Sequence, residues 1–297
     1  MKILLLGANG QVGTELQRTL LVLGELKSCT RAQANLEDLQ GLRSLIQDYQ
    51  PNIIVNAAAY TAVDQAESDK DKAELVNTDA VGVMAHEAKD LDAWLIHYST
   101  DYVFDGEKLN AYVESDPTSP INIYGNTKCK GEELITSSGC KHLIFRTSWV
   151  YGSHGNNFAK TMIRLFQEKD ELSVVNDQIG VPTSAELIAD VTSACLMQSL
   201  QKDTDLSGVY HLAPNGNTSW YGFAEYLCEK GKFIVDGMSN CSVGLSPIAT
   251  LQYPTPAKRP ENSLLNTNKI SQAFGVFMPM WQVHVDRFLN QTYGDWI

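Results

Sequence analysis

Tyr124 and Lys128 stand four residues apart in the segment Tyr124-Gly125-Asn126-Thr127-Lys128. On a helix, this spacing puts both side chains on one face, one turn apart. A lysine charge beside a buried phenol stabilises the phenolate, so it lowers the pKa of the tyrosine and suits proton transfer at neutral pH. The pair alone is a weak signal, because the same spacing also occurs on solvated helix surfaces.

Polar residues that follow an apolar run give the pair a context. Thr100 and Asp101 follow residues 94–98, Trp-Leu-Ile-His-Tyr, with only Ser99 between, and we expect residues 94–98 to form a buried strand. Ligands of open α/β sheets bind at the carboxyl ends of the strands. The hydroxyl of Thr100 is therefore a candidate to bind a reacting oxygen together with Tyr124.

Short apolar runs alternate with helical patterns through the first half of the chain. This alternation predicts right-handed βαβ units, and hence a Rossmann-type, doubly wound parallel sheet of the α/β class. We expect strands at 2–6, 53–55, 94–98 and 142–146, a second strand that ends in residues 27–31, and helices at 14–24, 39–49, 79–91, from 124 onward and at 158–168.

The rhythm changes near residue 150. We expect a dinucleotide-binding domain over residues 1–148 and a smaller, mainly substrate-binding lobe over 149–297, with some segments of the second half returning to the first domain. The segment from Cys241 to Pro260 holds four prolines and little periodicity. We interpret it as loops of the smaller lobe that face the ligand.

Gly7, Gly10 and Gly13 lie between the first expected strand and the first expected helix. Glycines there permit a tight turn and a close approach of the backbone to a pyrophosphate, which the helix N-terminus attracts. The spacing is G-x-x-G-x-x-G, and its position directly after the first strand favours a dinucleotide site. Small residues after the third strand, Ala57, Ala58 and Ala59, leave room for a cofactor or for helix packing.

The end of the second strand indicates which dinucleotide is bound. An acidic residue there would bind the ribose hydroxyls of NADH, yet the segment 27–31, Lys-Ser-Cys-Thr-Arg, has none. Thr30 and Arg31 are instead suited to a 2′-phosphate. We therefore expect NADPH, with NADH as the alternative.

Composition excludes several classes of function. The chain has 297 residues and a formal net charge of −12, which disfavours binding to nucleic acid or to an anionic membrane. No apolar run approaches the roughly 20 residues that span a bilayer. The six cysteines are scattered and no zinc motif is present, so we expect a cytoplasmic protein with reduced thiols.

Further motifs make the sequence resemble the extended short-chain dehydrogenase/reductase family, and within it the reductases of dTDP-linked 4-keto sugars. The resemblance covers nearly the whole chain. Its motifs are residues 7–13, 55–64, 97–104, 124–128, 146–151, 155–158, 176–183 and 253–260, the last reading Tyr-Pro-Thr-Pro-Ala-Lys-Arg-Pro.

The resemblance implies an activity and roles for particular residues. The reaction would be the NADPH-dependent reduction of the C4 ketone of dTDP-4-dehydro-L-rhamnose to dTDP-L-rhamnose, the last step of dTDP-rhamnose synthesis. Tyr124 would protonate the ketone oxygen, Lys128 would tune Tyr124 and bind the nicotinamide ribose, and Thr100 would orient the ketone. The expected substrate contacts are Thr100, Asp101 and Trp149 at the sugar, with Asn157 and Arg259 at the diphosphate or nucleoside.

The expected cofactor site joins these motifs to the glycine turn. Asn35 and Leu36 would lie beside the adenine, where many relatives have Asp before the apolar residue. The expected cofactor-binding residues are Gly7, Gly10, Gln11, Val12, Gly13, Thr30, Arg31, Asn35, Leu36, Ala57, Ala58, Ala59, Tyr60, Thr61, Tyr98, Tyr124 and Lys128.

Some relatives form a dimer linked by Mg²⁺ through acidic side chains. Glu15 and Glu186 match two of those positions, whereas Gln291 stands near the third. One fewer carboxylate weakens a site for a hard cation. We therefore expect a monomer or a homodimer and only a doubtful Mg²⁺ site.

Two alternatives remain open at this stage. The chain is also similar to reductases of another dTDP-4-keto-6-deoxyhexose, because stereochemistry depends on which ring face meets the cofactor. It is also similar to the non-catalytic regulatory subunit of methionine adenosyltransferase, which keeps a glycine-rich turn and a comparable Tyr/Lys pair. Trp149 and Arg259 favour an enzyme over that subunit.

Overall fold

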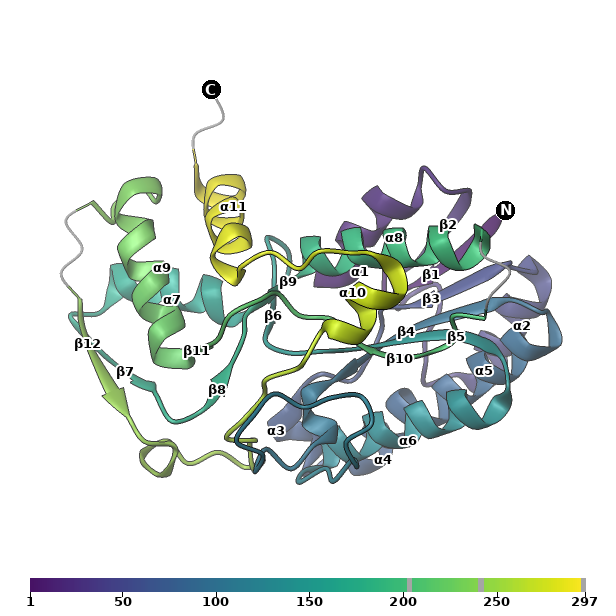
Figure 1. The fold of residues 1–297 in the computed structure, drawn as a ribbon, viewed down its shortest axis with the longest axis horizontal. Helices are drawn as coiled ribbons and strands as arrows, with labels where there is room; N and C mark the ends of the chain where they lie inside the picture. The colour runs from purple at the N-terminus through teal and green to yellow at the C-terminus, as the bar shows by residue number, and fades with distance from the viewer. Residues whose placement is uncertain (202–204, 240–242, 295–297) are drawn as a thin grey trace.

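Six parallel strands form the central sheet in a computed structural model that describes residues 1–201, 205–239 and 243–294 (Figure 1). The order of the strands in the sheet is β2-β1-β3-β4-β5-β10. The bounds are β1 (Lys2–Leu6), β2 (Glu25–Cys29), β3 (Ile53–Asn56), β4 (Trp94–Thr100), β5 (Lys141–Thr147) and β10 (Gly208–His211). Strands β1 and β3 consist almost entirely of buried residues, because helices cover both faces of the sheet.

Two groups of helices cover the two faces of this sheet (Figure 1). Leu16, Ile188 and Phe274 form one hydrophobic cluster with one face, and Leu42, Met84 and Ile135 form another cluster with the opposite face. The first group is α1 (Gln11–Leu20), α8 (Ala185–Gln201) and α10 (Asn268–Phe274), and the second is α2 (Leu39–Tyr49), α5 (Ala80–Asp90) and α6 (Ile123–Ser138).

A smaller lobe has a core of its own. Phe166, Phe223 and Phe288 are buried together with Trp281 in a third hydrophobic cluster. The helices of this lobe are α7 (Phe158–Glu168), α9 (Trp220–Ile234) and α11 (Trp281–Tyr293), and its parallel strand pair is β7 (Glu171–Val175) and β12 (Gly244–Ile248).

Short elements connect the sheet to this lobe. Strand β6 (Val150–Tyr151) pairs with β9 (Thr183–Ser184), and β8 (Ile179–Gly180) pairs with β11 (Thr218–Ser219). The remaining short helices are α3 (Val63–Ala66), α4 (Lys70–Glu74), the π-helix η1 (Leu75–Asp79) and the 3₁₀ helices η2 (Asp101–Val103) and η3 (Thr250–Gln252).

The predicted fold class is confirmed, and the predicted bounds of α2 and α7 match the structure. Helix α1 begins at Gln11 rather than Thr14, because Gly10 is already its N-cap. The prediction that residues 241–260 form only loops is wrong, since β12 pairs with β7 over its whole length. Pro247 is tolerated because it lies at the edge of a two-stranded pair. Cys241 lies outside the described residues.

Among the helices of residues 1–201, 205–239 and 243–294, none is long and apolar enough to span a membrane.

Candidate active site

A cleft of about 940 Å³ opens at the carboxyl ends of β1, β3, β4 and β5. Chain connections from β1 and β3 leave toward opposite faces of the sheet, so the cleft lies at the switch point where open α/β sheets bind ligands. Most of the sequence-predicted residues line it: Gly7, Gly10, Gln11, Val12, Arg31, Asn35, Leu36, Ala57, Ala58, Ala59, Tyr60, Thr61, Tyr98, Thr100, Asp101, Tyr124, Lys128 and Trp149.

The glycine turn leaves no room for side chains. Gly7 has φ +80°, and a Cβ there would lie 2.7 Å from the backbone nitrogen of Ala58. A Cβ on Gly13 would collide with the carbonyl oxygen of Gly7, which explains why Gly13 supports the turn without lining the cleft. Gly10 caps α1 without a side chain, so the helix N-terminus is open toward the cleft. Such a cradle of backbone fits a pyrophosphate.

Two cations line the cleft, and one of them, Arg31, follows the end of β2, where the Cys29 carbonyl accepts from the N–H of Gly7. Arg31 lines the cleft and pairs with Glu37. Lys72, which the sequence analysis missed, also lines the cleft, and its Nζ lies 3.1 Å from the same carboxylate. Thr30 does not line the cleft, because its N–H and hydroxyl both donate to the Gln33 side chain, at 2.9 and 3.1 Å. Lys72 and Arg31 form a site suited to a phosphate.

Tyr124 lies within the cleft near the start of α6, with Thr100 and Asp101 at the end of β4. Burial raises the pKa of Tyr124 to about 12, the charge of Asp101 adds to the rise, and a hydrogen bond with Thr100 opposes it. The expectation that Lys128 lowers the pKa of Tyr124 is therefore wrong, because burial dominates. The phenol keeps its proton at neutral pH, which suits a proton donor.

The hydroxyl of Thr100 has two partners besides Tyr124. It donates to Asp101 Oδ1 at 3.0 Å and accepts from the N–H of Tyr102 at 3.1 Å. Burial raises the pKa of Asp101 to about 6, although hydrogen bonds with Ser263 and Thr100 oppose the rise. Tyr102, a second residue that the sequence analysis missed, lines the cleft with its ring edge-on to Tyr124 at 5.6 Å.

Lys128 reaches the cleft from one turn further along α6. Its Nζ donates to the carbonyl oxygen of Tyr98 at 2.5 Å and lies 3.0 Å from His97 Nε2. Burial lowers the pKa of Lys128 to about 8, and the charge of Glu132 opposes that change. Tyr124 and Lys128 both face the cleft from α6, as their spacing predicts.

Comparisons with known proteins agree with this site. The family model described as "RmlD substrate binding domain" matches residues 1–293. The dTDP-4-dehydrorhamnose reductase of Escherichia coli K12 is 47% identical, over 99% of this chain and 98% of that protein. The one from Burkholderia thailandensis is 44% identical, over 96% and 97%. The chain belongs to the dTDP-4-dehydrorhamnose reductase family.

A solved structure extends this similarity to three dimensions. The dTDP-4-dehydrorhamnose reductase of Bacillus anthracis, a crystal structure in complex with NADP, has a TM-score of 0.89 and 34% identity. The match covers 98% of this chain and 99% of that one. In this family member, the open glycine cradle and the cations Arg31 and Lys72 fit a phosphorylated dinucleotide.

Trp149 stands where the reductase cleft meets the smaller lobe. It lines the cleft with φ +47°, a strained conformation for a tryptophan. Its ring stacks on Trp220 at 3.7 Å and 13°, and a Cβ on Gly180 would collide with it.

Tyr98, which also lines the cleft, is held from α8, since its hydroxyl bonds to Thr192 at 2.9 Å.

Two predicted substrate contacts lie outside the residues that line the cleft. Asn157 caps α7 and donates from Nδ2 to Gln11 Oε1 at 2.9 Å, so it adjoins a residue that does line the cleft. Arg259 forms an ion pair with Asp64, with Nη2 2.8 Å from Oδ2. It thereby joins the proline-rich segment to α3.

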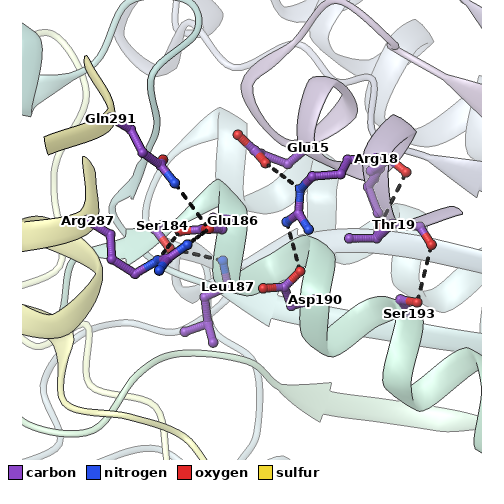
Figure 2. Close-up of polar contacts among 11 residues, drawn as sticks. Glu15, Arg18, Thr19, Ser184, Glu186, Leu187, Asp190, Ser193, Arg287 and Gln291 are labelled. Carbon is purple, nitrogen blue, oxygen red and sulfur yellow. Dashed lines mark hydrogen bonds and ion pairs between the residues drawn. The ribbon is translucent and has the colours of Figure 1, made fainter. Parts of the chain in front are cut away.

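The donor set for Mg²⁺ does not fit a cation in this reductase family member (Figure 2). Arg287 donates to both carboxylate oxygens of Glu186, from Nε at 3.0 Å and from Nη2 at 2.5 Å, and Gln291 lies 3.4 Å from one of them. Glu15 lies 3.5 Å from Arg18. Within the described part of the chain, no group of three or more acidic, His or Cys side chains is placed to hold a metal. Arginines thus occupy the carboxylates that the sequence offered.

Proposed function

We propose that the protein reduces the C4 ketone of dTDP-4-dehydro-L-rhamnose with NADPH, which yields dTDP-L-rhamnose. The observation that carries the proposal is the half-buried phenol of Tyr124, which keeps its proton beside Thr100 in a cleft that Lys128 also lines. Membership of the reductase family over residues 1–293 supports the substrate class.

NADPH is the proposed cofactor, with NADH as the weaker alternative. When bound, it supplies the hydride that the ketone carbon receives. The pyrophosphate would lie against Gly7 and Gly10 at the N-terminus of α1, and a 2′-phosphate would meet Arg31 and Lys72. The NADP complex of the Bacillus anthracis relative supports this assignment. The remaining cofactor contacts that we propose are the sequence-predicted residues that line the cleft, which leaves out Thr30, and Gly13 supports the turn from behind.

Three side chains divide the chemistry at the ketone. Tyr124 holds the proton that the ketone oxygen receives as it gains negative charge. Thr100 orients that oxygen by donating its single hydroxyl proton to it; without substrate this proton is donated to Asp101 Oδ1, while the Tyr102 N–H holds the hydroxyl oxygen. Lys128 presents its Nζ at the cleft wall, where it binds the nicotinamide ribose and holds positive charge when protonated.

The substrate is held from both parts of the chain. We infer that Asp101 and Trp149 contact the sugar, because both line the cleft beside Tyr124. Asn157 and Arg259 are proposed for the diphosphate or nucleoside side. In this proposal residues 1–148 mainly bind the dinucleotide and residues 149–297 mainly bind the substrate, although β10 and α8 return to the central sheet.

We further propose that each site is complete within one chain, whether the protein is a monomer or a homodimer. The glycine turn at Gly7, the proton donor Tyr124 and the sugar contact Trp149 all line the same cleft. A nucleotide-sugar reductase that uses NADPH and keeps Cys29, Cys140 and Cys195 as buried free thiols fits the cytoplasm.

The decisive experiment offers the purified protein NADPH and one of two nucleotide sugars. These are dTDP-4-dehydro-L-rhamnose and dTDP-4-keto-6-deoxyglucose, the epimeric control. We expect NADPH oxidation with the first only, and a product whose ring-proton couplings in NMR are those of rhamnose. Turnover of the control sugar instead would assign the chain to another dTDP-4-keto-6-deoxyhexose. Silence with both, despite NADPH binding, would favour a regulatory subunit.

A further inference from the structure

His97 lies directly behind Lys128 and outside the cleft. The imidazole is 1% exposed, is not among the residues that line the cleft, and places Nε2 3.0 Å from Lys128 Nζ. The other ring nitrogen, Nδ1, lies 3.1 Å from the side-chain nitrogen of Asn56 at the end of β3. His97 therefore connects a cleft residue to the loop that follows β3.

A backbone N–H fixes the orientation of this chain of contacts. The N–H of Ala58 is 3.1 Å from Asn56 Oδ1. A backbone N–H is a donor only, so it must face the oxygen of the Asn56 amide, and the NH₂ group must face His97. Two donors on that NH₂ group then require His97 Nδ1 to accept.

The proton of the imidazole is thereby placed on the other nitrogen. Burial, and next the charge of Lys128, holds the pKa of His97 well below its usual range, so the ring is neutral. A neutral imidazole carries one proton, and with Nδ1 accepting, that proton sits on Nε2 and faces Lys128 Nζ. An amine can accept this hydrogen bond, whereas an ammonium group has three donors and no acceptor.

We propose that His97 is a positioning residue for Lys128: the N–H of Ala58, acting through Asn56, holds the imidazole as the Nε2–H tautomer and so favours the neutral amine of Lys128 over the ammonium. This proposal deepens the proposed function and rests on it only for the effect on turnover. Since Ala58 lines the cleft beside Gly7, the proton occupancy of Lys128 is tied to the backbone that faces the cofactor.

Other charged groups around Lys128 do not replace this control. Glu132 lies one turn along α6 and favours the ammonium, but its carboxylate is held by Arg146 of β5 at 2.5–3.1 Å. Tyr124 lines the same cleft and is neutral at physiological pH. From β4, the contacts are His97 and the uncharged carbonyl of Tyr98. His97 is thus the neutral group whose tautomer determines whether Lys128 Nζ faces a hydrogen-bond donor or an acceptor.

NMR of ¹⁵N-histidine-labelled protein tests the tautomer without any turnover. Long-range ¹H–¹⁵N spectra show which ring nitrogen carries the proton, and loss of one signal set in His97→Gln assigns His97. Two other histidines serve as internal controls, because Nδ1 of His211 and of His142 faces a backbone carbonyl, at 3.1 and 2.9 Å. A carbonyl only accepts, so these rings must carry the proton on Nδ1 when neutral. We expect His97 alone of the three to show Nε2–H.

The isosteric variant Asn56→Asp should reverse the direction of the hydrogen bond between residue 56 and His97. A carboxylate accepts from both the Ala58 N–H and the imidazole, so the His97 proton moves to Nδ1 and Nε2 becomes an acceptor for an ammonium. The pKa of Lys128 then rises. In kcat/KM, the alkaline limb that marks loss of the Lys128 proton should move to higher pH by about one unit or more.

Outcomes for the two proposals are separable. Protonation of His97 at Nδ1 in the unmodified protein overturns the proposal, even if turnover is normal and even if Asn56→Asp fails to fold. An unmoved alkaline limb in a folded Asn56→Asp protein, with unchanged His211 and His142 signals, also overturns it. Absence of turnover with every nucleotide sugar instead contradicts the proposed function and leaves the tautomer measurement decisive for His97.

Discussion

Arg259 and Asp64 meet at two points across 195 positions of sequence, with Nη1 3.1 Å from Oδ1 and Nη2 2.8 Å from Oδ2. The Ala257 N–H adds a contact at 3.2 Å to the same carboxylate. This pair holds the proline-rich segment against α3, beside residues that line the cleft. The hydrogen bonds and charge of Arg259 lower the pKa of Asp64.

Replacing the acid tests whether the pair stabilises the fold or prepares Arg259 for an anion. Because Asp64 is partly exposed, we expect Asp64→Asn to cost only about 0.5–1 kcal/mol of unfolding free energy at neutral pH. A lowered pKa stabilises the folded state above the unfolded pKa, so the difference should vanish as acid protonates the carboxylate below about pH 4. Urea unfolding of the parent and of Asp64→Asn, at neutral pH and below pH 4, measures this difference in unfolding free energy. A difference that persists in acid would contradict the ion pair as its cause.

Arg259→Gln should instead act on substrate binding. If Arg259 contacts the diphosphate, its loss raises KM for the nucleotide sugar by about tenfold or more, as expected for a charge-assisted contact. NADPH affinity should stay constant. Steady-state kinetics on Arg259→Gln and Asp64→Asn separate the roles, since only the first removes the cation. Equal KM values in both variants would place Arg259 outside the substrate site.

Tyr124→Phe removes the proton donor and little else. We expect kcat to fall by about 10²–10⁴-fold, because no other group in the account protonates the ketone. Fluorescence titration should give an unchanged NADPH affinity. Tyr210→Phe is the matched control, since that buried phenol bonds to the Leu206 carbonyl at 2.9 Å and does not line the cleft. A similar loss in both variants would indicate general damage rather than lost catalysis.

The buried carboxylate of Asp101 lowers the stability of the protein when it is charged. Burial raises its pKa to about 6, so the folded state binds a proton more readily than the unfolded state does. Stability therefore falls as pH rises through the window from about 4 to about 6. Asp101→Asn removes the buried charge and should stabilise the protein at pH 8 by on the order of 2–3 kcal/mol, with little gain below pH 4.

Turnover of Asp101→Asn is the second half of that prediction. Loss of the carboxylate that accepts from Thr100 should raise KM for the sugar or lower kcat. Denaturation at two pH values and one kinetic series suffice. A variant that is less stable than the parent at pH 8 would show that the carboxylate is better solvated than the structure implies.

Arg31 and Lys72 should set the preference for NADPH. Both line the cleft and share Glu37, so each can turn to a 2′-phosphate. Arg31→Ala and Lys72→Ala should each weaken NADPH binding by about tenfold and leave NADH binding nearly constant, because NADH lacks that phosphate. Lys70→Ala, on the same short helix as Lys72, is the charge-matched control. Equal losses for both dinucleotides would contradict the assignment.

Local patterns were enough to predict much of the fold. Helices α2 and α7 are amphipathic and capped by Asp38 and Asn157, so their bounds follow from neighbouring residues. Strand β12 was missed because its pairing with β7 depends on a distant segment, and Pro247 hides its pattern. The turn at Gly7 was found because its glycines serve local backbone geometry.

The candidate site also combines features that follow from neighbouring residues with features that depend on the tertiary fold. Tyr124 and Lys128 were found because helical spacing is local. The pKa of Tyr124 depends on tertiary burial, which raises it, whereas the sequence analysis expected it to be lowered. Lys72 carries no signal of its own in the sequence, and His97 is part of the motif 97–104 but was given no role. Only the fold brings Lys72 to Glu37 and His97 to Lys128.

Isotope transfer shows whether the protein moves a hydride from NADPH to C4 of the nucleotide sugar. NADPH deuterated at C4 of the nicotinamide, in separate preparations for each face, is incubated with the protein and dTDP-4-dehydro-L-rhamnose. One preparation should place deuterium on C4 of the sugar, giving dTDP-L-rhamnose that lacks the H4 signal in its proton NMR spectrum. Rhamnose product that retains H4 with both preparations, or no reduced sugar at all, would contradict this expectation.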